Sequence, residues 1–196
     1  SFAANFMPIL DWETEFAVKW SNLSDAQMNE GIRDPIKAFE YMNRYYVLEG
    51  NKRVSVLKYF NAVSIPAIVT RKIPKLSDDY DVRLYYEYMK FNEITGLCSV
   101  EFTKLGNADK LLSLVGKEGR WDDETKEKFA KVMFDFSKVY NFRGGDRLDI
   151  KLGDAITVFM EVFGMDAMLE MSENDYNKNV INTWKEFAAE GEKHKI

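Results

Sequence analysis

The residues with the clearest capacity for chemistry form one short turn, Glu49-Gly50-Asn51-Lys52-Arg53. Gly50 can adopt backbone angles that other residues avoid, so the chain can turn sharply there. A helix that begins at this point has unpaired backbone N–H groups at the positive end of its dipole, where anions and phosphate groups bind. Lys52 and Arg53 add positive charge at the same end. The turn is therefore a candidate phosphate site, although it specifies no reaction.

The residues on either side of this turn predict a strand before it and a helix after it. Residues 45–48 are aromatic, β-branched or apolar, with no strand breaker among them. Val54, Leu57 and, less regularly, Phe60 lie at helical spacing and predict one apolar helix face. The candidate site is thus a strand-to-helix connection.

Short helices are expected in residues 5–35. Asp11 or Thr14 can cap the first of them, which carries apolar residues at helical spacing. The sequence Ser-Asp-Ala-Gln at residues 24–27 has the form of a capping box, which predicts the start of a second helix. Gly31 is expected to end it as a C-cap residue.

Further strands predict a small mixed unit in the first part of the chain. They are expected at residues 36–39 and 65–71, with Pro66 at the start or edge of the latter because proline lacks a backbone donor. Residues 41–44 are expected to form a turn. These elements predict a mixed domain over residues 1–75.

The pattern becomes mainly helical after residue 75. One short strand is expected at residues 99–103. Helices are predicted at residues 82–93, 111–115, 123–140, 154–163 and 174–189. The predicted fold class is therefore α+β, with a small mixed domain at 1–75 followed by a mainly α-helical module at 76–196.

Composition narrows the class of protein. Of 196 residues, 46% are apolar, which is enough for a packed core. No run of 18 apolar residues and no secretory signal occur, so neither a membrane span nor secretion is expected. The net charge of −5 disfavours DNA as a partner, because binding the phosphate backbone needs a basic face.

Cysteine and histidine usage limits the chemistry further. The single cysteine, Cys98, excludes an intramolecular disulfide and a multi-cysteine metal site, and it fits a reducing cytoplasm. Its small and apolar neighbours predict a buried thiol. The single histidine, His194, lies in a charged tail and is expected to be solvated. We therefore expect a cytoplasmic protein without a histidine triad or zinc site, and the oligomeric state is left open.

An ordered set of motifs resembles a known family. The blocks at residues 31–38, 45–57 and 65–69 resemble the N-terminal domain of ParB proteins, a "ParB-like nuclease" domain of the ParB/sulfiredoxin superfamily. The resemblance extends over about residues 8–75. Its most specific part is the order of a glycine turn, a Pro-Ile strand, a second strand, a Gly-x-x-Arg turn, a helix and an Ile-Pro strand.

The resemblance implies a ligand for the turn. In the family this turn cradles the phosphates of a nucleotide, which is CTP in ParB proteins and ATP in sulfiredoxin. By position, Gly50 would be the turn glycine and Arg53 the phosphate arginine, while Lys52 stands where ParB often has arginine and sulfiredoxin has histidine. Asn51 stands where sulfiredoxin has its catalytic cysteine, which argues against sulfiredoxin chemistry. No recognition-helix pattern follows residue 75, which places chromosome partitioning in doubt.

Three carboxylate or cationic residues near the turn have alternative roles. Glu49 could be a general base or hold a metal-bound phosphate such as a magnesium–nucleotide complex, or it could simply pair with Lys52 or Arg53. Glu30 and Arg33 flank the earlier glycine turn, which packs beside the phosphate turn in the superfamily, so both are candidate ligand contacts.

Two other clusters favour structural roles. The carboxylates of residues 143–149 and Asp154 invite a metal site, but their spacing does not fit an EF-hand, and a turn with a helix cap at Asp154 is the preferred interpretation. The aromatic residues between Tyr85 and Phe91 could stack bases, but at helical spacing they are more typical of a core. No metal ligands are therefore predicted.

The sequence leaves two functions open. The first is the binding of a nucleotide or another phosphate-bearing small molecule at the Glu49–Arg53 turn, with hydrolysis or phosphotransfer undecided. The second is a non-catalytic regulatory module that uses the ParB-like domain as a scaffold for DNA or protein.

Overall fold

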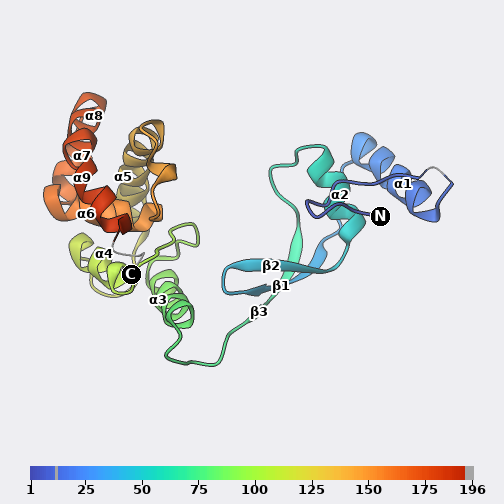
Figure 1. Cartoon of the computed structure of the whole chain (residues 1–196), viewed down its shortest axis with the longest axis horizontal. Coiled ribbons are helices and arrows are strands. Elements are labelled where there is room, and N and C mark those ends of the chain that lie inside the picture. The colour runs from blue at the N-terminus through green and yellow to red at the C-terminus, as the bar shows by residue number, and fades with distance from the viewer. Residues whose placement is uncertain (12, 193–196) are drawn as a thin grey trace. The chain divides into compact units, whose positions relative to one another are not determined.

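The chain has an α+β fold with a small mixed sheet and a helical C-terminal part (Figure 1). The structure is a computed structural model, and it describes residues 1–11 and 13–192. The chain divides into two compact units, Ser1–Lys75 and Leu76–Ile196. His194, expected to be solvated, lies outside the described residues.

The first unit begins with a single long helix where two short helices were predicted. Helix α1 spans Glu15–Asn29, and the hydroxyl of Thr14 caps it by accepting from the N–H of Ala17. The Ser24–Gln27 capping-box prediction is therefore wrong, because helical hydrogen bonding continues through polar residues that cost a helix interior only a few tenths of a kcal/mol. Gly31 follows the helix with a φ of +76°, as expected for a C-cap glycine.

The sheet of the first unit mixes antiparallel and parallel pairing. Strand β1 (Ile36–Tyr41) lies between β2 (Arg44–Glu49) and β3 (Ala67–Lys72). The β1–β2 hairpin closes through Met42 and Asn43, whose φ values of 50° and 61° are those of a type I′ turn. Strand β3 runs parallel to β1, and helix α2 (Asn51–Tyr59) provides the crossover between β2 and β3.

One face of this sheet carries the small core of the first unit. Alternate residues of β1 are buried, beginning with Ile36 and Ala38. Helix α2 buries Val54 and Leu57, as the helical spacing predicts, and α1 packs beside it (Figure 1). Phe60 lies beyond the last turn of α2 and is exposed, so its predicted place on the apolar face is wrong.

The second unit is built from helices around an aromatic core. Its elements are α3 (Tyr80–Thr95), α4 (Asn107–Val115), α5 (Asp123–Phe142), the short 3-10 helix η1 (Gly145–Arg147), α6 (Leu152–Phe163), α7 (Met165–Glu170), α8 (Glu173–Asn182) and α9 (Trp184–Glu192). The fully buried side chains include Phe129, Phe136, Phe159 and Phe187. None of the helices in the described part of the chain is both long and apolar enough to cross a membrane.

Three predictions for the second unit were wrong. Residues 99–103 form no strand in the described structure, although Val100 and Phe102 alternate into the core. The single helix predicted at 174–189 is broken at Thr183 into α8 and α9. Cys98 is exposed because it lies in the loop that follows Gly96, where its sulfur accepts from the side chain of Asn92.

Three of the aromatic residues of α3 belong to the interior. Tyr85, Tyr88 and Phe91 are buried, and Phe91 lies in the hydrophobic core of the second unit. The hydroxyl of Tyr88 donates to the carbonyl of Cys98 over 3.0 Å. Buried rings cannot stack on bases, so the core interpretation of this cluster is the one that the structure supports.

Candidate functional site

The predicted phosphate turn joins β2 to α2 through a left-handed glycine. Gly50 is the N-cap residue of α2, with a φ of 101° and a ψ of 22°, and no side chain caps this end of the helix. The first helical hydrogen bond runs from the N–H of Val54 to the carbonyl of Gly50 over 3.0 Å. Within the described residues, the N–H groups of Asn51, Lys52 and Arg53 therefore have no acceptor.

Gly50 is also required by the room available to it. A Cβ at this position would lie 2.7 Å from Cγ2 of Ile36 and 3.2 Å from Nε of Arg53. Both distances are shorter than ordinary van der Waals contacts. The start of β1 thus packs directly against the turn, and a side chain at residue 50 would force the two apart.

Arg53 is held by the segment that precedes β1. Its Nη1 donates to the carbonyl of Pro35 over 2.7 Å and to the carbonyl of Asp34 over 3.2 Å. A guanidinium has five N–H donors in a rigid plane. Neither Nε nor Nη2 of Arg53 has an acceptor among the residues that the structure describes, so this side chain is oriented by the protein and retains donors for a ligand.

The other charged residues of the turn each have a partner. Nζ of Lys52 lies 5.7 Å from the centre of the Phe16 ring, a cation–π contact. Oε2 of Glu49 lies 2.7 Å from Nζ of Lys37 on the neighbouring strand. The hydrogen bond and charge of Lys37, and then the charge of Arg53, hold the pKa of Glu49 below its ordinary value. A lowered pKa weakens Glu49 as a general base, and its role in the site stays a prediction.

The earlier segment reaches the turn through Asp34, Pro35 and Ile36, and the ligand roles of Glu30 and Arg33 stay predictions. Glu30 and Arg33 are exposed, and the described structure has no hydrogen bond or ion pair between their side chains and the turn. Asp34, Pro35 and Ile36 make the contacts instead, mostly through backbone atoms. Sequence reasoning missed them because backbone carbonyl contacts leave no mark on residue type.

Asp154, in the second unit, serves the fold. The carboxylate of Asp154 is fully buried and accepts from the backbone and hydroxyl of Thr103, both at 2.7 Å, and from Nδ2 of Asn107 at 2.8 Å. It also accepts from the backbone N–H of Lys151, the N-cap residue of α6, over 3.2 Å. No group of three or more metal-binding side chains is gathered within the described ranges.

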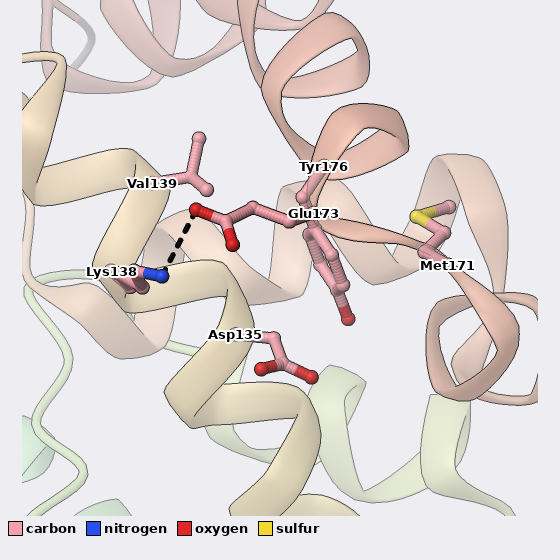
Figure 2. A pocket seen from close by; sticks show the side chains of 6 residues that line it. All are labelled: Asp135, Lys138, Val139, Met171, Glu173 and Tyr176. Carbon is pink, nitrogen blue, oxygen red and sulfur yellow. Dashed lines mark hydrogen bonds and ion pairs between the residues drawn. The ribbon is translucent and has the colours of Figure 1, made fainter.

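A small pocket in the second unit offers little room for a ligand (Figure 2). It lies between α5 and α8 and has a volume of about 70 Å³. An ion pair between Lys138 and Glu173, 2.9 Å apart, crosses it. One water molecule needs on the order of 10–15 Å³ of such a cavity, so the pocket has room for a few waters and for no nucleotide.

Comparisons with family models, with curated proteins and with solved structures find no match to this chain. The ParB/sulfiredoxin resemblance therefore rests on the motifs around Gly31, Gly50 and Pro66 alone. The resemblance remains a prediction.

Proposed function

We propose that the Gly50–Arg53 turn binds the phosphate groups of a small ligand, most simply a nucleotide such as CTP or ATP. The observation that carries this proposal is the uncapped start of α2, where three consecutive N–H groups lack acceptors beside an oriented guanidinium. Unpaired N–H groups at a helix N-terminus favour anions through both hydrogen bonding and the helix dipole.

Each residue of the turn has a distinct part in this proposal. Gly50 lets the backbone approach the phosphate, and the N–H groups of residues 51–53 donate to its oxygens. Arg53 adds charge-assisted hydrogen bonds from its remaining donors, and these bonds are the strong ones. Lys52 would supply a second positive charge if its ammonium group moved from the Phe16 ring to the phosphate. Magnesium would enter with the nucleotide, bound mainly to phosphates and water.

Turnover is a separate matter from binding. For Glu49 to act as a base it would have to leave Lys37, and its lowered pKa makes it a weak acceptor at neutral pH. Binding without turnover is therefore the simpler proposal, because it does not require Glu49 to leave Lys37. A cytoplasmic location agrees with a nucleotide ligand and with a single thiol that makes no disulfide.

A second candidate is a non-catalytic scaffold for DNA or a protein partner. It is favoured by one observation, that Glu49, Lys52 and Arg53 all have partners within the chain. A pocket that had lost its ligand would retain such internal pairing. This alternative predicts that the turn binds no phosphate and that its residues matter for stability alone.

Calorimetric titration of the whole chain with CTP, ATP, GTP and ADP, with and without magnesium, separates the two candidates. Arg53→Ala should weaken binding by about tenfold or more, the value of one charge-assisted hydrogen bond of roughly 1.5–3 kcal/mol. Lys58→Ala is the matched control, because Lys58 is a cation of the same helix at its opposite end. The control should bind as tightly as the parent.

The outcomes are distinct. Absence of binding at millimolar nucleotide, or equal losses in Arg53→Ala and Lys58→Ala, would reject the phosphate site and favour the scaffold. Nucleotide hydrolysis that disappears in Glu49→Gln would add an enzyme activity to the site. Hydrolysis that survives in Glu49→Gln would remove Glu49 from the catalytic role.

A further inference from the structure

The face of the sheet that points away from Ile36 and Ala38 is rich in aromatic and basic residues. Strand alternation and the pairing register place one set of side chains on it. We call this set the aromatic face: Lys37, Phe39, Tyr41, Arg44, Tyr46, Glu49, Ile68, Thr70 and Lys72. Its rings are accessible, since Tyr41 and Tyr46 are 39% and 44% exposed.

The side chains of the aromatic face form one contiguous surface. The rings of Phe39 and Tyr46 are stacked, with centroids 4.9 Å apart and planes inclined by 14°. Nζ of Lys72 lies 5.7 Å from the centre of the Phe39 ring. In the register, Tyr41 lies opposite Arg44 on one side and Lys72 on the other. Stacked rings are therefore bordered by two cations.

The charge of this region differs from that of the chain as a whole. Residues 1–75 carry ten basic and eight acidic side chains, a net charge of +2, whereas the chain has −5 and residues 76–196 therefore −7. On the aromatic face the neighbouring carboxylate is that of Glu49, which pairs with Lys37. Interactions between exposed charges are screened beyond about 8 Å at physiological salt, so the local positive charge decides what binds here.

We infer that the aromatic face binds single-stranded nucleic acid. Bases stack on exposed aromatic rings whatever their sequence, and cations beside the rings meet the phosphates. Tyr46 and Tyr41 would take the bases, and Arg44 and Lys72 the backbone. A duplex would not fit this role because its bases are already stacked. Exposed apolar side chains alone would fit a protein partner, and the bordering cations favour nucleic acid.

This surface adjoins the proposed nucleotide site at the Lys37–Glu49 ion pair, but the N–H groups and Arg53 of that site lie at the Gly50 turn. Gly50 packs against Ile36, whose side chain lies on the opposite face of the sheet. A mononucleotide at the turn should therefore leave an oligonucleotide on the aromatic face in place. Failure of either proposal can be recognised without reference to the other.

Fluorescence anisotropy of the whole chain with labelled 15-nucleotide oligo-dT and oligo-rU tests the inference. Tyr46→Ala should weaken binding by about 5- to 150-fold, the range for stacking of one base. Tyr45→Ala is the matched control, because Tyr45 is 66% exposed on the same strand and points to the other face. Tyr45→Ala should bind within about twofold of the parent, and Tyr46→Phe, which keeps the ring, should do the same.

The cations have their own signature. Arg44→Gln and Lys72→Gln should each weaken binding and reduce its salt dependence, because each removes one phosphate contact. Similar affinity for the two oligonucleotides is expected, whereas binding of only one would assign the surface to DNA or to RNA.

Several results would overturn the inference. These are no binding of either oligonucleotide at 50 mM salt, equal losses in the Tyr45 and Tyr46 variants, or displacement of the oligonucleotide by CTP. A dimer in light scattering that Tyr46→Ala dissociates would instead assign the face to a second copy of the chain. Thermal melts of every variant exclude unfolding as the cause of a loss, and the losses expected for Arg44→Gln and Lys72→Gln retain the test if Tyr46→Ala does not fold.

Discussion

Replacing Gly50 by alanine is the sharpest structural test of the turn. At a φ of 101° an L-residue is strained by about 1–2 kcal/mol. The new Cβ would lie 2.7 Å from Cγ2 of Ile36, and relieving such overpacking typically costs about 1–3 kcal/mol. Alanine also reduces the conformational entropy of the unfolded chain, which stabilises the folded state by about 0.4–1 kcal/mol. We therefore expect Gly50→Ala to lower the free energy of unfolding by about 1–5 kcal/mol.

Gly31→Ala provides the matched control for this substitution. Gly31 also has a positive φ, of +76°, but a Cβ there would meet no atom within 4 Å. Gly31→Ala should be destabilised by the backbone strain alone, so its free energy of unfolding should fall by about 1.6 kcal/mol or less. Urea unfolding followed by circular dichroism and tryptophan fluorescence measures both changes. Equal losses in the two variants would show that the turn does not pack on Ile36 as described.

Three further predictions concern single carboxylates. Asp154→Asn should destabilise the chain by about 1–3 kcal/mol in urea unfolding, because an amide cannot accept from all the donors around this buried group. Asp109→Asn, at an exposed ion pair, should cost less than about 1 kcal/mol. A hydrogen bond from Lys117, then bonds from Thr125, hold the pKa of Asp122 below its ordinary value of 3.8. The parent should therefore be more stable than Asp122→Asn by a constant amount above about pH 4, and the difference in the free energy of unfolding should shrink as the pH falls toward the folded pKa. A difference that grows on acidification would contradict this. Lys37→Gln should raise the pKa of Glu49 toward its ordinary value in a carboxylate NMR titration, and an unchanged pKa would show that Lys37 is not its partner.

Features set by neighbours in sequence could be predicted. The strand, glycine turn and helix around Gly50 follow from local chemistry. The Met42–Asn43 hairpin turn is of the same kind. In each case the residues that form the feature lie within a few positions of one another.

Features set by distant partners could not be predicted. Residues 99–103 alternate like a strand, but the buried carboxylate of Asp154 takes the N–H of Thr103 in place of a neighbouring strand. The carbonyls that bind Arg53 are 18 and 19 residues away, and any residue type supplies a carbonyl. Residue type therefore indicated Arg53 as a candidate phosphate ligand without indicating which backbone carbonyls it contacts.

Amide chemical shifts test the central claim most directly, because the claim concerns particular N–H groups. A titration of the ¹⁵N-labelled chain with CTP, and separately with inorganic triphosphate, should shift the amides of Asn51, Lys52 and Arg53 most strongly and saturably. The same titration of Arg53→Ala should need about tenfold or more ligand for the same shift. Shifts confined to other residues, or none at millimolar ligand, would show that the start of α2 is not a phosphate site.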